Sequence, residues 1–198
     1  MPTLPEISSP LHIDVPLRQH RDYLHSTNLF DFLVQRTGVQ EDLSLMFRQK
    51  VTAECDAFPA AEIEHAERCP VRFTGRTGAE AVDLVLVERE PRMALSRREP
   101  YDEEAVAAGS RIQDAAIFSG GANGATAIER IVALNKRLLT NLTQSQRVLV
   151  FSRLWLRRVP PQEADLEIRL ESRLGQTLFR SAILANGERT GEIVFYGT

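Results

Sequence analysis

The clearest hydrophobic pattern along the chain lies in its last third. Apolar residues recur there at helical spacing, and the stripe consists of Ala127, Ile128, Ile131, Leu134 and Leu138. Spacings of three and four residues place side chains on one face of a helix. The pattern predicts one helix over residues 125–139 that packs on a sheet. The charged residues of this segment, from Glu129 to Arg137, sit off the stripe.

Strands are predicted after this helix, over residues 148–159, 166–171, 177–185 and 189–196. In the second, the apolar residues Leu166, Ile168 and Leu170 alternate with charged ones, which is typical of a strand with one buried face. Asn186-Gly187 predicts a tight hairpin, because both central positions of a type I′ turn need positive φ. Consecutive strands with short connections favour an antiparallel meander.

Residues 1–70 carry weaker patterns, and we interpret them as an extension of arm and helices that packs on the core. Residues 1–20 are rich in proline and predict an extended arm. Candidate N-cap residues from Ser26 to Asn28, an apolar cluster and Gly38 predict a helix between them. Residues 40–47 predict a second short helical segment, and residues 51–58 fit either a strand or an extended connection.

A change of pattern at Val71 marks the start of the predicted domain, residues 71–198. Alternation predicts short strands over residues 71–73, 82–87 and 93–95, and the last two are joined by a turn around Pro91. Residues 101–110 predict a surface loop, and residues 112–118 form a short apolar run. The predicted class is α+β, with an antiparallel sheet wrapped around one central helix.

Composition and charge argue against some classes of function. The chain has 198 residues, of which 43% are hydrophobic, and carries a net charge of −3. That balance argues against a protein that neutralises many phosphates of a nucleic acid. We expect no membrane span, because no apolar run is long enough. Two cysteines and the absence of a secretory pattern in the first residues favour a cytoplasmic protein.

Several motifs of the last two thirds resemble hot-dog-fold proteins, in particular β-hydroxyacyl-ACP dehydratases and their thioesterase relatives. Phe118-Ser119-Gly120 resembles the Phe-Pro-Gly before the dehydratase helix, and Gly124 followed by Glu129 resembles the step into that helix. The segment from Gly175 to Glu192 resembles the last two strands. The resemblance spans about residues 82–196. It implies a hot-dog fold, an acyl-CoA or acyl-carrier-protein substrate, a homodimer or larger homo-oligomer, and no cofactor.

Departures from this pattern keep other functions open. Ile117 stands where the dehydratases have a histidine, and the first seventy residues match neither group. A non-catalytic hot-dog module that binds an acyl group or a partner is therefore one alternative. The other is a chorismate pyruvate-lyase-like enzyme that makes hydroxybenzoate. The segment Val82–Arg97 resembles the middle of such enzymes, and Glu192 resembles a glutamate of their terminal strand. There Val82 replaces the expected arginine.

The candidate site lies at the start of the predicted helix. Glycine lets a substrate approach the backbone closely, so Gly120, Gly121 and Gly124 are candidates for a turn that binds the thioester carbonyl. Unpaired N–H groups and the helix dipole favour negative charge there. Glu129 is the candidate acid–base group. Alternatively, the glycines form an ordinary strand-to-helix loop, and Glu129 is a surface carboxylate.

Further residues extend this candidate site. Asp114 is a second catalytic candidate, and Phe118 is a candidate contact for the substrate. Arg153 and Arg157 lie along one predicted strand and are candidates for binding the phosphates of coenzyme A or a carrier-protein arm. His25 is the best placed of the histidines. No cysteine and histidine spacing predicts a metal site.

Overall fold

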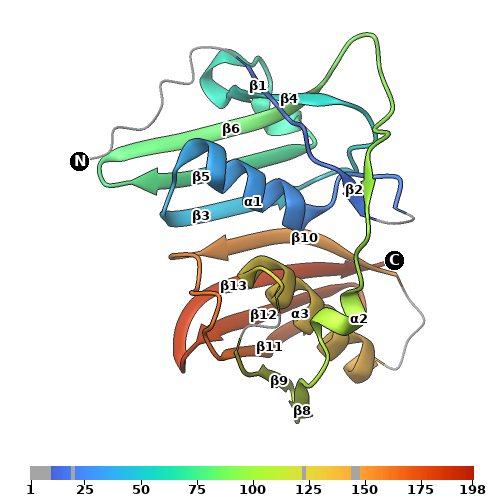
Figure 1. The fold of residues 1–198 in the computed structure, drawn as a ribbon, viewed down its shortest axis with the longest axis vertical. Helices are drawn as coiled ribbons and strands as arrows, with labels where there is room; N and C mark the ends of the chain where they lie inside the picture. Colours follow the sequence, from blue (N-terminus) through green and yellow to red (C-terminus); the bar gives the residue numbers. More distant parts are fainter. Residues whose placement is uncertain (1–9, 19–20, 122–123, 144–147) are drawn as a thin grey trace. The chain divides into compact units, whose positions relative to one another are not determined.

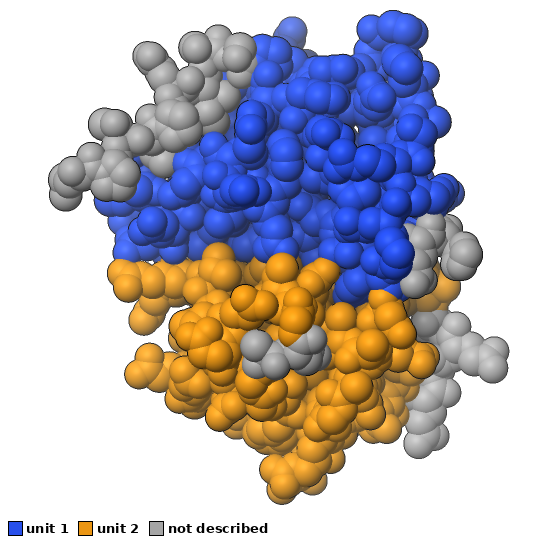
Figure 2. Space-filling model, in the orientation of Figure 1, with its two compact units in different colours: residues 1–101 blue, residues 102–198 orange. Residues whose placement is uncertain are grey.

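The computed structural model describes residues 10–18, 21–121, 124–143 and 148–198. The chain divides into two compact units, residues 1–101 and residues 102–198, which Figure 2 colours separately. Each unit combines antiparallel strands with one long helix, and Figure 1 labels most of these elements. Among the described residues, no helix is both long and apolar enough to cross a membrane.

The second unit is an antiparallel sheet with helix α3 (Ala127–Thr143) against it. A short helix α2 (Glu103–Val106) precedes the sheet. The strands, in sheet order, are β10 (Leu149–Leu156), β13 (Glu188–Gly197), β12 (Leu178–Ala185), β11 (Leu166–Leu174), β9 (Ala116–Ser119) and β8 (Arg111–Gln113). This order confirms the predicted central helix and the antiparallel strands after it.

The predicted face of α3 is the buried one. Ile128, Ile131, Leu134 and Leu138 are at most 1% exposed. Burial of each such side chain stabilises the fold by roughly 1.5–3 kcal/mol. The helix runs to Thr143, one turn beyond the predicted end at residue 139. The helix–sheet pair is the hot-dog-like α+β arrangement that the sequence predicts.

The first unit also contains antiparallel strands. In sheet order its strands are β1 (Leu11–His12), β4 (Cys55–Pro59), β6 (Glu80–Glu88), β5 (Val71–Thr77) and β3 (Glu41–Phe47). It also contains helix α1 (Ser26–Thr37) and the short 3-10 helices η1 (Ala60–Glu62) and η2 (Ala66–Arg68). A separate parallel pair joins β2 (Leu17–Arg18) to β7 (Arg98–Glu99).

The two units share an architecture that the sequence analysis did not recognise. In each, a strand that precedes the helix pairs with the second strand after it: β1 with β4, and β9 with β11. Counted from the helix, the strands of the second unit run first, fourth, third, second across the sheet. Those of the first unit run first, third, fourth, second. The units therefore differ by an exchange of the two inner strands.

This architecture differs from the expected division near residue 70. Strands β5 and β6 lie beyond residue 70, yet they pair with β3 and β4, which lie before it. The compact units instead divide after Tyr101. The extension of residues 1–70 thus supplies a helix and strands to a sheet, and only part of it resembles an arm. Residues 1–9 and 19–20 of that arm lie outside the described residues.

Three local predictions were wrong. The predicted helix over residues 40–47 is strand β3, in which Leu43 and Leu45 are fully buried and alternate with more exposed neighbours. Pairing with β5 overrides the helical appearance of this segment. The predicted strand over residues 93–95 is reduced to one bridge, between Ala53 and Ala94. The predicted loop over residues 101–110 contains α2, which Asp102 caps by accepting from the Ala105 N–H at 3.0 Å.

Candidate functional site

The predicted glycine turn connects β9 to α3. It begins with Gly120, directly after β9, and continues with Gly121 at φ 45° and Gly124 at φ 86°. Glycine adopts such positive φ angles without the steric cost that a Cβ atom brings. Residues 122 and 123 lie outside the described part of the chain. Gly121 and Gly124 therefore have a conformational role, and contact of the three glycines with a substrate remains a prediction.

A hollow of about 380 Å³ opens beside this turn. Its lining includes Arg111, Phe118, Gly120, Asp165, Glu167 and Gly187. The Arg111 guanidinium lies 5.7 Å from the centre of the Phe118 ring, a distance at which a cation is attracted to an aromatic face. The hollow thus combines an aromatic wall, a backbone segment without side chain, a cation and two carboxylates.

The N–H group of Gly120 faces away from the protein interior. The carbonyl oxygen of Ser119 accepts a hydrogen bond from the buried Arg130 guanidinium at 3.4 Å. In a planar trans peptide the C=O and the following N–H point in opposite directions. The Gly120 N–H therefore points away from Arg130, and no described residue accepts a hydrogen bond from it. Because Gly120 lines the hollow, this amide is a candidate donor to a bound group.

Arg130 is the buried centre of the site, although its place off the apolar stripe suggested a surface residue. Its side chain is fully buried, and it donates to three backbone carbonyls: Gln162 at 2.7 Å, Ala164 at 3.0 Å and Ser119 at 3.4 Å. One nitrogen, Nη2, serves both Ser119 and Ala164. Burial lowers the pKa of Arg130, and the nearby Asp165 carboxylate opposes that change. A buried cation therefore ties the glycine turn to the connection between β10 and β11.

Asp165 contacts the turn from the connection between β10 and β11. Its Oδ1 accepts a hydrogen bond from the Gly121 N–H at 3.4 Å. Its backbone is held by Asn186, whose side-chain oxygen accepts from the Asp165 N–H at 3.0 Å and whose N–H donates to the Asp165 carbonyl at 2.8 Å. Sequence analysis overlooked Asp165 and Arg130. Asp165 stands immediately before an alternating strand, which was the only signal available for it.

Glu129 lies in the first turn of α3 and helps to cap the start of that helix. One of its carboxylate oxygens accepts from the Thr126 N–H at 2.8 Å, and the Thr126 hydroxyl accepts from the Glu129 N–H at 3.2 Å. This reciprocal pair is a capping box, which satisfies donors at the start of a helix. Glu129 is 9% exposed and is not part of the lining of the hollow. Its acid–base role remains a prediction.

The other predicted residues lie elsewhere in the second unit. Asp114, at φ 52°, occupies the exposed turn between β8 and β9, at the opposite end of β9 from Gly120. Arg153 and Arg157 are exposed on or just after β10, at the opposite edge of the unit's sheet from β9 and β8. Phe118 alone of these non-glycine candidates lines the hollow. The predicted site therefore comes together only in part.

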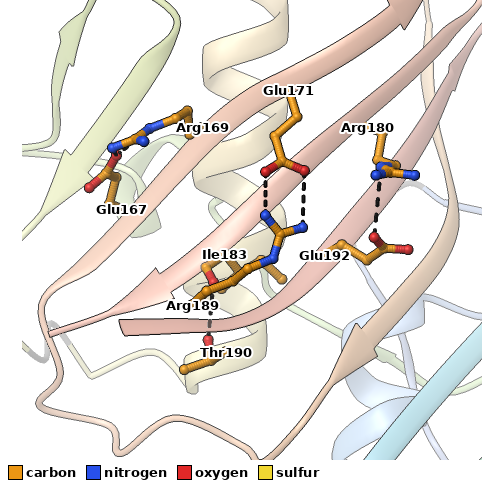
Figure 3. A network of polar contacts seen from close by, with 8 residues as sticks. All are labelled: Glu167, Arg169, Glu171, Arg180, Ile183, Arg189, Thr190 and Glu192. Carbon is orange, nitrogen blue, oxygen red and sulfur yellow. Dashed lines mark hydrogen bonds and ion pairs between the residues drawn. The ribbon is translucent and has the colours of Figure 1, made fainter. Parts of the chain in front are cut away.

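Ion pairs cover the face of this sheet that Figure 3 shows. Arg189 pairs with Glu171, Arg169 with Glu167 at 2.8 Å, and Arg180 with Glu192 at 3.7 Å. The hydrogen bond from Arg189 lowers the pKa of Glu171. Glu192, the residue on which the chorismate-lyase alternative relied, is thus part of a surface network.

His25 belongs to the first unit, where it is 5% exposed at the start of α1. Its Nδ1 lies 2.8 Å from the Thr27 hydroxyl, and its ring is 5.5 Å from that of Tyr101. A second polar cluster thus exists at a helix start. Within the described ranges, no three residues of metal-binding type come together.

Comparison with known proteins finds structural rather than sequence similarity. No protein-family model and no curated protein sequence matches the chain. Solved structures with a similar fold include a conserved hot-dog-fold protein of unknown function from Alicyclobacillus acidocaldarius, with 11% identity and a TM-score of 0.49 over 99% of this chain and 96% of that one.

Two further solved structures are described as a dehydratase domain and a thioesterase. A monomeric dehydratase domain from a trans-AT polyketide synthase split module has 13% identity and a TM-score of 0.47, over 96% of this chain and 100% of that one. An acyl-ACP thioesterase from Bacteroides thetaiotaomicron has 9% identity and a TM-score of 0.44, over 91% and 92% of the two chains. At such identities the likeness concerns the fold alone.

Proposed function

We propose that the second unit binds an acyl thioester of coenzyme A or of an acyl carrier protein and acts on it in the hollow beside the Ser119–Gly121 turn. The observation that carries this proposal is the Gly120 N–H, which is directed away from buried Arg130 at the edge of that hollow. The motifs shared with hot-dog dehydratases and thioesterases support the choice of substrate.

The chemistry of the turn suits a thioester carbonyl. A backbone N–H held in place by the fold stabilises negative charge that develops on a carbonyl oxygen, without reorganisation during the reaction. Arg130 donates to the carbonyl of the same peptide unit, so it polarises that unit and strengthens the Gly120 N–H as a donor. The Phe118 ring offers apolar surface for the neighbouring acyl or thiol portion.

A non-catalytic acyl-binding module is the second candidate. The observation in its favour is the engagement of Glu129, the carboxylate predicted to act as acid or base, in the capping box with Thr126. Ile117, in place of the dehydratase histidine, is fully buried. A binding module would use the hollow and the Gly120 N–H but would release the thioester intact.

We also propose that the protein assembles at least as a homodimer. The support is a row of apolar residues across three neighbouring strands. Leu178 lies opposite both Leu174 and Tyr196, which are 70% and 47% exposed. Phe179, the neighbour of Leu178, is 2% exposed, so this row occupies the opposite face of the sheet.

The direct test is a hydrolysis screen with acetyl-, octanoyl- and benzoyl-coenzyme A, in which released thiol is detected with a chromogenic disulfide. Calorimetric titration with the corresponding non-hydrolysable alkyl thioethers measures binding separately. Release of thiol supports the enzyme. Binding without release supports the module, and neither binding nor release would refute the proposed function.

A further inference from the structure

We propose that Asp165 is the catalytic carboxylate of this site, acting as the general base that activates water for thioester hydrolysis. This inference rests on the proposed function and adds to it the reaction and the acting residue. It replaces Glu129, which the helix pattern suggested, by a residue from the connection between β10 and β11. Three features support this role: the position of Asp165 beside the hollow, the hydrogen bonds that hold its backbone, and the engagement of the neighbouring carboxylates elsewhere.

Asp165 has the right position. It lines the hollow together with Gly120, and a Cβ atom built on Gly120 would lie 3.5 Å from Asp165 Oδ1. The carboxylate thus borders the space next to the candidate carbonyl-binding amide. Its side chain is exposed to solvent, so water has access to it. A general base must lie within hydrogen-bond reach of the proton that it removes, and this placement allows a water between Asp165 and a carbonyl at Gly120.

Asp165 is also held in place. Arg130 Nη2 donates to the carbonyl that precedes Asp165 in the chain and to the carbonyl that precedes Gly120. One buried nitrogen therefore fixes the peptide units that carry the proposed base and the proposed oxyanion donor. Asn186 holds the Asp165 backbone from the other side through two hydrogen bonds. Such double anchorage is the support that a catalytic constellation needs.

The other carboxylates near the turn are engaged elsewhere. Glu129 accepts from the Thr126 N–H and does not line the hollow. Glu167 lines the hollow but pairs with Arg169 at 2.8 Å. Asp165 makes a longer contact, 3.4 Å, with the Gly121 N–H. Of these three, Asp165 alone combines access to the hollow with the absence of an ion pair within the described residues.

The Asp165 carboxylate takes a proton from water while the water oxygen forms a bond to the thioester carbon. The carbonyl π electrons move to the oxygen, where the Gly120 N–H stabilises the negative charge. The intermediate then collapses, the C–S bond breaks, and the proton on Asp165 passes to the leaving sulfur. The products are a carboxylic acid and a thiol.

The experiment compares Asp165→Asn with Glu163→Gln and Glu129→Gln in the full chain. Glu163 is an exposed carboxylate of the same connection and serves as the matched control. We expect Asp165→Asn to lower kcat for octanoyl-coenzyme A by about 100-fold or more, the usual contribution of a positioned acid–base group. Affinity for the octyl thioether of coenzyme A should stay within a few-fold. Glu163→Gln should leave kcat unchanged.

Each alternative outcome identifies what has failed. Wild-type hydrolysis that survives in Asp165→Asn would overturn the role of Asp165 and leave the proposed function intact, as would a larger loss in Glu129→Gln. Binding of the thioether without hydrolysis by the wild type would also overturn it, in favour of the binding module. Absence of both binding and hydrolysis would refute the proposed function itself. Unchanged thermal melting of Asp165→Asn excludes misfolding as the cause of lost turnover.

Discussion

Thr126 and Glu129 hydrogen-bond to each other in both directions at the start of α3, with the Glu129 carboxylate 2.8 Å from the Thr126 N–H. We expect Thr126→Ala to lower the free energy of unfolding by about 1 kcal/mol, the usual loss for a helix cap. Glu129→Gln should change it little, because glutamine also completes a capping box. Urea unfolding followed by circular dichroism measures both. Thr140→Ala, an exposed change on the same helix, is the control. An equal loss of unfolding free energy in that variant would contradict the capping role of Thr126.

Arg130 should contribute more to stability than any cap. Arg130→Met keeps an unbranched side chain but removes the hydrogen bonds to three buried or partly buried carbonyls. An unsatisfied buried acceptor costs about 1–3 kcal/mol, so we expect a loss of about 2–4 kcal/mol in urea unfolding.

Arg137 offers a matched control for this change. It lies on the same helix, is exposed, and donates to one carbonyl, that of Ala107, at 2.7 Å. Arg137→Met should therefore cost clearly less than Arg130→Met. Equal losses would show that Arg130 is not the anchor of the turn.

Asp56 should make the first unit sensitive to acid. The hydrogen bond from Arg89 lowers the pKa of Asp56 below the ordinary value of 3.8, with a further contribution from His12. A carboxylate whose folded pKa is depressed stabilises the fold above its unfolded pKa, and this contribution is lost as pH falls through the folded value. Urea midpoints of the wild type should fall as pH drops below about 4.

The variant Asp56→Asn isolates this effect. It should be less stable than the wild type at neutral pH, and the difference should shrink as the pH falls below about 4. Glu64→Gln, an exposed change in the same unit, controls for general charge effects. A difference that stays constant with pH would contradict the role of the Arg89 pair.

Light scattering tests the proposed homodimer. We expect a mass of at least twice the chain mass for the wild type and a smaller mass for Leu174→Glu, because a charge would be buried in the apolar interface. Met93→Glu changes another exposed apolar residue, one of the first unit, and should leave the mass unchanged. A monomeric wild type would contradict the dimer, and an unchanged mass in Leu174→Glu would exclude this surface.

The second unit was largely predictable because its patterns are local. The stripe of α3, the alternation of β11 and the Asn186-Gly187 turn each depend on neighbouring residues, and the structure places Asn186 and Gly187 at φ 50° and 81°. Strand β3 was missed because its identity depends on pairing with β5, more than twenty residues later in the chain. The same long-range pairing concealed the strand order of the first unit and with it the two-unit organisation.

The candidate site was likewise predictable only in part. The glycine turn was predictable because positive φ angles select glycine. Arg130 was not, because its burial depends on carbonyls from the connection between β10 and β11, some thirty residues away. Asp165 was not predictable either, because it belongs to that same connection and reaches the turn only in the folded chain. Sequence distance therefore concealed the residues that support the site, while local pattern revealed its backbone.

Binding of a thioester analogue to variants of Gly120 tests the central claim most directly. Gly120 does not require positive φ, and a Cβ there meets Asp165 Oδ1 at 3.5 Å, an ordinary contact. Gly120→Ala should therefore fold and bind the octyl thioether of coenzyme A nearly as the wild type does. Gly120→Val should fold as well, but its branched side chain occupies the part of the hollow next to the Gly120 N–H. Calorimetric titration should then show affinity at least tenfold weaker. Equal affinity of the wild type and Gly120→Val would contradict a thioester site at this turn.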